Sequence, residues 1–319
     1  MQSEKDFESR LEQRGISRRG FLKYCSVIAG ALGLGPAFGP HVYRAFAASP
    51  KPSVLWLHFA ECTGCTEAAL RTSSPGFVDL IFDVISLDYH ETVMAAAGTQ
   101  AEDTLQNTAL KKEGQFFCVV EGSIPTAAGG IYGMIGGRTM LSIAQDVCNK
   151  AKAVIALGTC ASFGGIAAAY PNPTGAKGVK DALWPQLSVP VINISGCPPN
   201  PVNFVGTIAN YLLNGNLPSL DSLGRPQFAY SQTVHSRCPY RENEGRCLRD
   251  EGCKGPDCHN NCPTARFNDG TSWPVQAGHP CIGCSEPNFW DTMTPFYRES
   301  GESDGSDDHS EYGRGTYDD

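Results

Sequence analysis

The stretch SVLWLHFAECTGCTE, residues Ser53–Glu67, joins a nearly continuous apolar run to a Cys-x-x-Cys pair. A run of this kind predicts a strand that is buried on both faces of a parallel sheet. Cys62 and Cys65 follow it directly, where such a strand turns toward a helix. This spacing alone leaves four interpretations open: a redox dithiol, half of a zinc site, one end of a disulfide, or part of an iron–sulfur cluster.

Similar apolar runs recur along the chain. The runs at 116–120, 153–157 and 189–194 predict further strands, and the run at 80–87 resembles them. Helical patterns lie between the runs, at 66–72, 137–150 and 202–213. The alternation of strand and helix up to about residue 215 predicts a doubly wound α/β domain.

Beyond residue 218 the pattern changes. Residues 230–297 show no strong period and contain seven cysteines, so we expect bound metal to replace the missing apolar core. The tail, residues 298–319, is acidic and poor in apolar residues, which predicts disorder. The net charge of −8 argues against nucleic acid as a partner and favours basic partners instead.

The N-terminus has the features of an export signal. Ser17-Arg-Arg-Gly-Phe-Leu-Lys23 precedes an apolar stretch rich in Gly and Ala, and Ala45-Phe-Ala47 fits a cleavage site. We predict a twin-arginine signal peptide over residues 1–47. The predicted protein is periplasmic and has no membrane anchor of its own, because the apolar stretch is shorter than the ~20 residues that a membrane span needs. The twin-arginine route carries folded proteins, so the thirteen cysteines that remain without Cys25 favour metal over disulfides.

The cysteines of the first domain are expected to converge. In an open parallel sheet, ligands collect at the carboxyl ends of the strands. Cys62 and Cys65 follow one predicted strand, Cys160 follows a second and Cys197 follows a third. Four thiols at one edge suit an iron–sulfur cluster, with buried apolar thiols and a four-cysteine zinc site as the alternatives. In the second domain, His235 and the seven thiols are enough for two metal sites, and zinc ribbons are the alternative there.

Six motifs together carry a resemblance to a known family. They are ECTGCTE (Glu61–Glu67), VEGSIP (Val120–Pro125), GTC (Gly158–Cys160), GCPPNP (Gly196–Pro201), GCKGP (Gly252–Pro256) and PCIGCSEP (Pro280–Pro287). In this order they resemble the small subunit of nickel–iron uptake hydrogenases. The likeness extends from residue 52 to about residue 297 and includes the export leader.

The resemblance implies three iron–sulfur clusters in this chain and a nickel–iron centre in a separate large subunit. By motif, it assigns the proximal 4Fe-4S cluster to Cys62, Cys65, Cys160 and Cys197. It assigns the distal 4Fe-4S cluster to His235, Cys238, Cys247 and Cys253, and the medial 3Fe-4S cluster to Cys262, Cys281 and Cys284. Cys118 and Cys148 are then most simply core residues, and Cys258 stays unassigned.

The expected fold is therefore α/β. A flavodoxin-like, doubly wound parallel sheet domain (48–217) binds the proximal cluster, and an irregular iron–sulfur-cluster domain (218–297) binds the other two. The resemblance implies a heterodimeric hydrogenase in which this chain has no catalytic residue and passes electrons from the large subunit to an external acceptor. The expected acceptor is a basic multihaem c-type cytochrome or a membrane cytochrome.

Two other classes of protein share some of these features. A stand-alone multi-cluster electron carrier would need no catalytic partner. The related cluster-binding chain of quinone-reducing respiratory complexes would have adjacent proximal cysteines and no second cysteine-rich domain, so the sequence disfavours it.

The chain also departs from the family in its details. Only eight residues separate Cys238 from Cys247, where the family commonly has a longer insertion. Oxygen-tolerant members add two cysteines around the proximal cluster, at positions where this chain has Gly64 and Gly165. The resemblance therefore implies an oxygen-sensitive enzyme.

Overall fold

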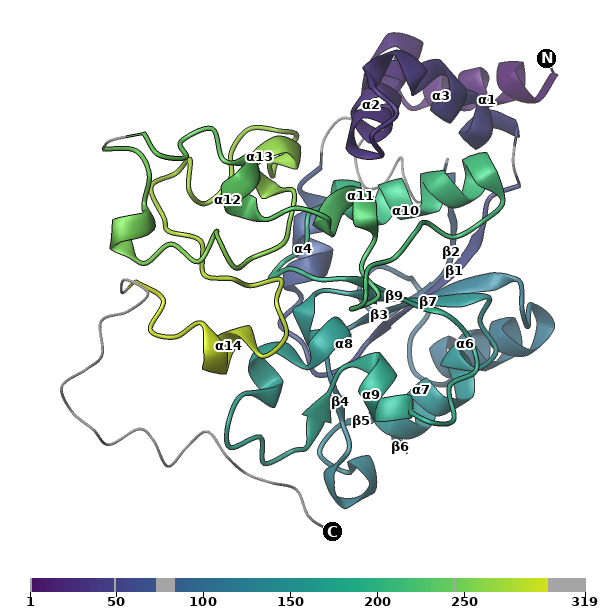
Figure 1. Ribbon diagram of the computed structural model, residues 1–319. Coiled ribbons are helices and arrows are strands. Elements are labelled where there is room, and N and C mark those ends of the chain that lie inside the picture. The colour runs from purple at the N-terminus through teal and green to yellow at the C-terminus, as the bar shows by residue number, and fades with distance from the viewer. Residues whose placement is uncertain (1, 49, 73–83, 244, 298–319) are drawn as a thin grey trace.

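The computed structural model describes residues 2–48, 50–72, 84–243 and 245–297. At its centre lies a five-stranded parallel sheet with the order β2-β1-β3-β7-β9 (Figure 1). The strands are β1 (Ser53–His58), β2 (Ser86–His90), β3 (Phe116–Glu121), β7 (Ala153–Leu157) and β9 (Val191–Ile194). Counted along the chain, this is the 2-1-3-4-5 order of flavodoxin-like folds, which confirms the predicted fold class.

The inner strands are buried on both faces, as their continuous apolar runs predict. Every residue of β1, β3 and β7 is buried. Successive side chains of β1 belong to opposite cores, with Val54 and Trp56 on one face of the sheet and Leu55 and Leu57 on the other.

Helices cover both faces of the sheet (Figure 1). The first core includes residues of α4 (Gly64–Leu70) and α10 (Pro201–Asn214), and the second includes residues of α6 (Thr99–Lys111), α7 (Met140–Cys148) and α9 (Val179–Leu183). Local capping fixes two helix starts: the Asn200 side chain accepts from the Val202 amide at 3.0 Å, and Thr139 accepts from the Ser142 amide at 3.0 Å. The three predicted helices correspond to α4, α7 and α10.

Two elements differ from the expectation. The run at 80–87 predicts a strand, but β2 begins only at Ser86, and residues 80–83 lie outside the described part of the chain. On this edge strand Asp88 pairs with Lys112 at 2.6 Å, so the strand carries polar side chains and not an apolar run. Helix α6 was not predicted, because Leu105 and Ala109 are its only buried residues and most of its other side chains are polar.

The predicted leader forms three helices, α1 (Gln2–Gln13), α2 (Arg18–Ala31) and α3 (Gly39–Ala48). Helices α2 and α3 lie against α10, at the top of Figure 1, and α1 packs on α2 and α3. The predicted signal peptide is therefore packed onto the domain. Phe7, Phe21, Tyr43 and Phe46 form an aromatic cluster between these helices, with edge-on ring contacts of 5.3–6.1 Å. Among the described residues, no helix combines the length and the apolar character needed to cross a membrane.

The cysteine-rich part lies beside the sheet domain, at the left of Figure 1, and has only short helical turns. These are α11 (Gln227–Tyr230), α12 (Val234–Arg237), a 3-10 turn (Arg249–Glu251), α13 (Cys262–Ala265) and α14 (Phe289–Thr292). Polar contacts join it to the sheet domain. The amides of Asn203 and Asn261 exchange two hydrogen bonds, of 3.1 and 2.7 Å, and the Tyr230 hydroxyl donates to the Ser195 carbonyl at 2.7 Å.

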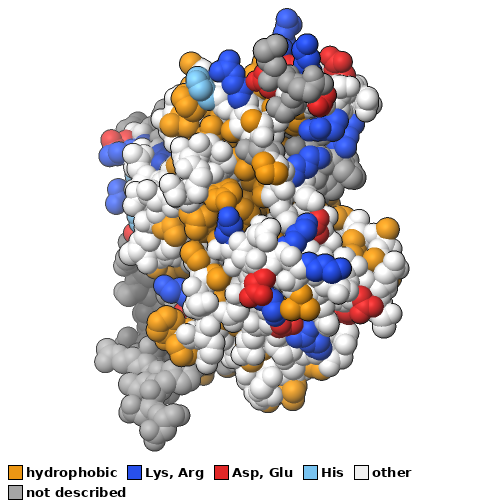
Figure 2. Space-filling view, turned by 90° about the vertical axis from the view of Figure 1, so that its right-hand side faces the viewer, with side chains coloured by type: hydrophobic (Ala, Val, Ile, Leu, Met, Phe, Trp, Pro, Cys, Tyr) orange, Lys and Arg blue, Asp and Glu red, His pale blue; other side chains and the backbone are white. Residues whose placement is uncertain are grey.

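The remaining elements are short. They are α8 (Thr159–Phe163) and the two-residue strands β4 (Ile124–Pro125), β5 (Met134–Ile135), β6 (Arg138–Thr139) and β8 (Ala176–Lys177). On the face shown in Figure 2, Lys and Arg form several separate groups with Asp and Glu among them. This face therefore has no continuous basic surface of the kind that binds nucleic acid.

Candidate metal centres

The first group of thiols lies where three parallel strands end. Cys62 and Cys65 follow β1 at the start of α4, Cys160 follows β7 in α8, and Cys197 follows β9. Burial is the main cause that raises the pKa of Cys65, followed by the charge of Glu121. The other three thiols raise this pKa as well, so the four sulfurs are close enough to act on one another electrostatically. Burial, with Cys160 and Cys62 nearby, raises the pKa of Cys197 to about 11. The four predicted proximal ligands are therefore brought together, and metal binding would require them as thiolates.

The backbone leaves room for these sulfurs at two glycines. A Cβ atom on Gly158 would lie 2.5 Å from Cys65 Sγ, and one on Gly165 would lie 2.6 Å from Cys160 Sγ. Both glycines have positive φ, of +92° and +58°. Only glycine fits this approach of backbone to sulfur, and such crowding is typical of turns that enclose an iron–sulfur cluster.

Glu121, at the end of β3, holds the Cys-x-x-Cys turn in place. The N-cap residue of α4, Thr63, has left-handed φ of 63° and makes no side-chain cap. Glu121 Oε1 instead accepts from the Cys65 and Thr66 amides, both at 3.1 Å. Its Oε2 accepts from the Thr66 hydroxyl at 2.6 Å and from Trp56 Nε1 at 3.3 Å. A carboxylate from a neighbouring strand therefore replaces the missing helix cap.

A second polar group lies beside this turn. His58 Nδ1 is 3.3 Å from Glu61 Oε1, and these atoms together with a Glu121 oxygen lie within 4.8 Å of one another. Four hydrogen bonds already engage the two Glu121 oxygens, so a metal ion at this trio would have to compete with them. Glu61 Oε2 is buried and has no hydrogen-bond partner, next to the exposed Cys62.

The second group of ligands surrounds α12. His235 lies on α12, and Cys238 follows this helix directly. Burial is the main cause that raises the pKa of Cys253, and the nearby thiols of Cys238 and Cys247 raise it further. The His235 amide donates to the Gly255 carbonyl at 2.9 Å, and a Cβ on Gly255 would lie 3.3 Å from Cys253 Sγ. Burial first, then Arg241 and Arg249, lowers the pKa of His235, which favours the neutral imidazole that binds metal.

The short segment between Cys238 and Cys247 is held by a stack of side chains. The Tyr240 and Trp273 rings are nearly parallel, 4° apart, with centroids separated by 6.5 Å. The Arg246 guanidinium lies 4.2 Å from the centroid of the Tyr240 ring. The Tyr240 amide also donates to Cys238 Sγ at 3.4 Å, so this loop contacts a predicted ligand directly.

The third group of thiols lies between the other two. Cys262 begins α13, and both Cys262 and Cys281 are electrostatically linked to Cys284. The Thr159 hydroxyl, from α8 of the sheet domain, donates to the Cys284 carbonyl. Burial raises the pKa of Cys262 to about 12, so these thiols too are neutral without metal.

Hydrogen bonds connect the three groups in order. Thr159, the neighbour of Cys160 in the first group, donates its hydroxyl proton to the Cys284 carbonyl of the third. The Cys281 amide of the third group donates to Cys253 Sγ of the second at 3.3 Å. The thiol group with Cys262 therefore lies between the other two groups.

The other cysteines fall into two kinds. Cys118 on β3 and Cys148 on α7 are fully buried, with sulfurs 3.8 Å apart, which confirms their interpretation as core residues. Cys258, which no motif assigns, lies among the medial thiols. Its position four residues before Cys262 is the only sequence signal for this placement.

In the sequence, Glu121 is noticeable only as a neighbour of the proximal turn. Its side chain is 1% exposed, so it is neither a surface group nor free to contact a partner.

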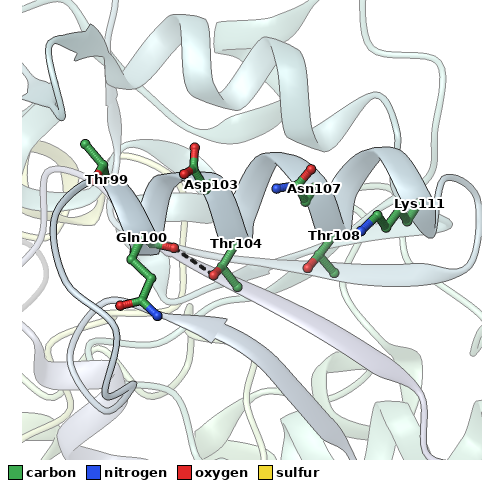
Figure 3. A pocket seen from close by; sticks show the side chains of 7 residues that line it. All are labelled: Thr99, Gln100, Asp103, Thr104, Asn107, Thr108 and Lys111. Carbon is green, nitrogen blue, oxygen red and sulfur yellow. Dashed lines mark hydrogen bonds between the residues drawn. The ribbon is translucent and has the colours of Figure 1, made fainter.

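A pocket elsewhere has no connection with these thiols. It is lined by Thr99, Gln100, Asp103, Thr104, Asn107, Thr108 and Lys111, all from α6 (Figure 3). Among these side chains, the Thr104 hydroxyl donates to the Gln100 carbonyl at 2.7 Å. The pocket is the polar outer face of one helix, and it contains no thiol or imidazole that binds metal.

Two family models match the chain. Residues 62–211 match the family described as NADH ubiquinone oxidoreductase, 20 Kd subunit. Residues 230–297 match the C-terminal family of the NiFe/NiFeSe hydrogenase small subunit. The first match covers the sheet domain and the proximal thiols. The second covers the cysteine-rich part, which is expected to be absent from the respiratory protein.

Relatives of known type are similar over nearly the whole chain. The periplasmic NiFe hydrogenase small subunit 1 of Nitratidesulfovibrio vulgaris is 55% identical, over 91% of this chain and 96% of its own. The quinone-reactive Ni/Fe-hydrogenase small chain of Wolinella succinogenes is 46% identical, over 90% of this chain and 85% of its own. The solved Ni-Fe-Se hydrogenase of Desulfomicrobium baculatum has a TM-score of 0.74 and 37% identity, over 79% of this chain and 100% of that chain. The chain therefore belongs to the family of nickel–iron hydrogenase small subunits.

Proposed function

We propose that this chain is the electron-transferring subunit of a periplasmic nickel–iron hydrogenase and carries three iron–sulfur clusters. Residues 48–217 hold a proximal 4Fe-4S cluster, and residues 218–297 hold the medial and distal clusters. The proximal ligands are Cys62, Cys65, Cys160 and Cys197. The distal 4Fe-4S ligands are His235, Cys238, Cys247 and Cys253, and the medial 3Fe-4S ligands are Cys262, Cys281 and Cys284.

The observation that carries this proposal is the connection of the three thiol groups. The hydrogen bond from Thr159, next to Cys160, to the Cys284 carbonyl joins the proximal group to the medial group, and the bond from Cys281 to Cys253 joins the medial group to the distal group. A linear order of sites suits the stepwise movement of single electrons across a protein. When bound, iron–sulfur clusters take up and release one electron at a time.

The side chains and amides around the thiols fit that chemistry. Amides donate to the sulfurs of Cys238 and Cys253, and such hydrogen bonds are among the factors that set cluster potentials. A neutral His235 in place of a thiolate removes one negative charge from the distal site, which also acts on the potential. His235 is half-buried, so we assign the exit for electrons to this end of the chain.

The proximal end is assigned to the large subunit, which carries the nickel–iron centre and splits hydrogen. Cys62 is exposed in the isolated chain, beside the unpartnered Glu61 Oε2. A large subunit over this turn would bury the ligand and keep water away from it. At the distal end, the net charge of −8 suits a basic multihaem c-type cytochrome or a membrane cytochrome as acceptor.

The leader indicates that the protein is exported to the periplasm. The segment Ser17–Lys23 is the part of a twin-arginine signal that the export receptor reads, and residues 1–47 would be removed after transport. Relatives such as the Nitratidesulfovibrio protein are named as periplasmic, which supports this location.

The test is purification of the exported complex from cells that express both subunits. We expect a second chain that contains nickel, iron at all three ligand sites, and hydrogen-dependent reduction of a basic multihaem cytochrome. A stable chain with iron but without a nickel-containing partner would instead identify a stand-alone electron carrier. Absence of iron from the purified chain would contradict the cluster assignment altogether.

A further inference from the structure

Arg225 is a buried charge at the boundary between the sheet domain and the cysteine-rich part. Its side chain is 4% exposed, and none of the six sequence motifs includes it. Its Nε donates to Asp221 Oδ2 at 2.8 Å, and its Nη1 donates to Glu286 Oε1 at 3.0 Å and to the Ser285 carbonyl at 3.3 Å. The guanidinium also lies 5.4 Å from the centroid of the Tyr230 ring. One buried cation is therefore bonded to carboxylates from two distant parts of the chain.

The Asp221 side of this network belongs to the edge of the sheet. Asp221 Oδ1 accepts from the Leu223 and Arg225 amides, at 2.9 and 2.8 Å, which fixes the turn between these residues. The Gly224 carbonyl of the same turn accepts from the Asn193 amide of β9 at 2.8 Å. The turn that carries Arg225 is therefore fixed to the sheet.

The Glu286 side of the network joins the two segments that carry the predicted medial ligands. Ser285 and Glu286 follow Cys284 directly, and His259 lies three positions before Cys262. Glu286 Oε1 accepts from the His259 amide at 2.6 Å, and the Ser285 hydroxyl donates to the His259 carbonyl at 2.9 Å. The buried guanidinium therefore holds a junction of both ligand segments to the sheet domain.

Stability alone does not explain a guanidinium at this place. Apolar side chains of similar volume often replace a buried ion pair without loss of stability. They could not supply a positive charge beside the turn that follows Cys284. Reduction adds negative charge to a cluster, so a positive charge nearby favours the reduced form. The two carboxylates hold the guanidinium in place and act on the potential in the opposite direction.

We propose, on the basis of the function proposed above, that Arg225 is a positioning residue of the medial cluster and that its positive charge raises the reduction potential of this cluster. It acts through the turn from Cys284 to Glu286, which its guanidinium holds against the sheet domain.

The test is a potentiometric titration of the complete, exported heterodimer, with the signal of the oxidised medial cluster followed by electron paramagnetic resonance. Arg225→Met removes the charge and keeps much of the side-chain volume. It should lower the medial potential and change the ratio of oxidised to reduced cluster about three- to tenfold at a given potential, where tenfold corresponds to about 59 mV for one electron. Arg225→Lys keeps the charge but loses the fork of donors that contacts both carboxylates. This variant should restore most of the potential, although its Tm should still be lower than that of the wild type.

A second variant separates the effect of charge from a distortion of the site. Glu286→Gln has nearly the same shape, and its amide oxygen can still accept from Arg225 and from the His259 amide. It removes a negative charge, so the medial potential should rise. A merely structural role of the network would not give shifts of opposite sign in Arg225→Met and Glu286→Gln. If Arg225→Met does not assemble, the direction of the shift in Glu286→Gln decides.

Arg138→Met is the matched control. The Arg138 side chain is half-buried and donates to the Ser142 carbonyl and to Asp146, both on α7 of the sheet domain. This variant loses a partly buried ion pair and should leave the medial potential unchanged.

Two results would overturn the inference. One is an unchanged medial potential in either Arg225→Met or Glu286→Gln, which would leave the network with a packing role alone. The other is a shift of the same sign in both variants, which would indicate a distorted ligand site. Failure of the proposed function is distinct from both, because the wild-type heterodimer would then lack iron at the predicted ligand sites.

Discussion

The replacement of Glu121 tests how the proximal turn is held. Glu121→Ala leaves the partly buried amide of Cys65 and the buried amide of Thr66 without an acceptor. Each such amide costs about 1–3 kcal/mol. The removal of a buried carboxylate returns part of this cost, because its own desolvation penalty disappears. We expect a net loss of about 3 kcal/mol, which corresponds to about 6–12 °C in Tm for a domain of this size.

Two further variants separate charge from hydrogen bonding. Glu121→Gln keeps one oxygen that accepts from both amides, but its NH₂ group then faces Trp56 Nε1, which is also a donor. We expect about 1–2 kcal/mol of destabilisation for this variant. Glu67→Ala is the control on the same helix: its side chain is 56% exposed and 3.8 Å from Arg71, so the change should stay within about 0.5 kcal/mol.

The assay is thermal unfolding of the purified heterodimer, together with its iron content. Because Cys62 and Cys65 depend on the start of α4, Glu121→Ala should also lower occupancy of the proximal site in proportion to its loss of stability. A Glu121→Ala heterodimer with unchanged Tm and full iron would refute the capping role. Equal effects in the Glu67 control would refute it as well, because they would point to the charge of the region in general.

Three other predictions concern export, pH and oxygen. Replacing Arg18 and Arg19 by lysine should leave both subunits in the cytoplasm on cell fractionation, and normal periplasmic amounts would contradict the export signal. Burial raises the pKa of Glu91 from 4.5 to about 8, so the native state holds a proton that the unfolded state releases, and stability falls as pH rises between these values. Glu91→Gln should reduce the pH dependence of the denaturant midpoint between pH 5 and pH 8. An unchanged pH dependence would show that other groups cause the loss of stability. With glycine at both Gly64 and Gly165, the heterodimer on an electrode should lose hydrogen-oxidation current when oxygen is pulsed in and recover only at reducing potential, whereas sustained current under air would count against oxygen sensitivity.

Much of the sheet could be predicted from the sequence because its inner strands are buried on both faces. Phe116–Glu121 has apolar side chains at five successive positions, and all six residues of β3 are buried. The convergence of Cys62, Cys160 and Cys197 follows from topology, since parallel strands end at one edge of the sheet. β2 and α6 lack this signal because they carry many polar side chains, which is why the bounds of β2 and the existence of α6 were not predicted.

The supporting residues were harder to predict because their partners are far away in the chain. Glu121 caps a helix that lies 55 positions earlier, and no local pattern connects a strand end with a left-handed residue such as Thr63. The spacing of Cys258 from Cys262 could not show that its thiol lies beside the Ser285 hydroxyl. The apolar residues of the leader suit an export signal and also suit helix packing onto α10, so the sequence alone could not predict the packing.

The cysteine-rich part depends on a core that its sites share. Val234 precedes the predicted distal ligand His235, Trp273 stacks on the loop that carries Tyr240, and both pack with Cys258, near the predicted medial ligands. This cluster is small for about eighty residues without regular structure, so we expect bound metal to supply much of the folding free energy. Because one small core supports predicted ligands of two sites, we expect the medial and distal sites to fold as a single unit. The hydrogen bond from Cys281 to Cys253 Sγ makes the same connection between ligands of the two sites.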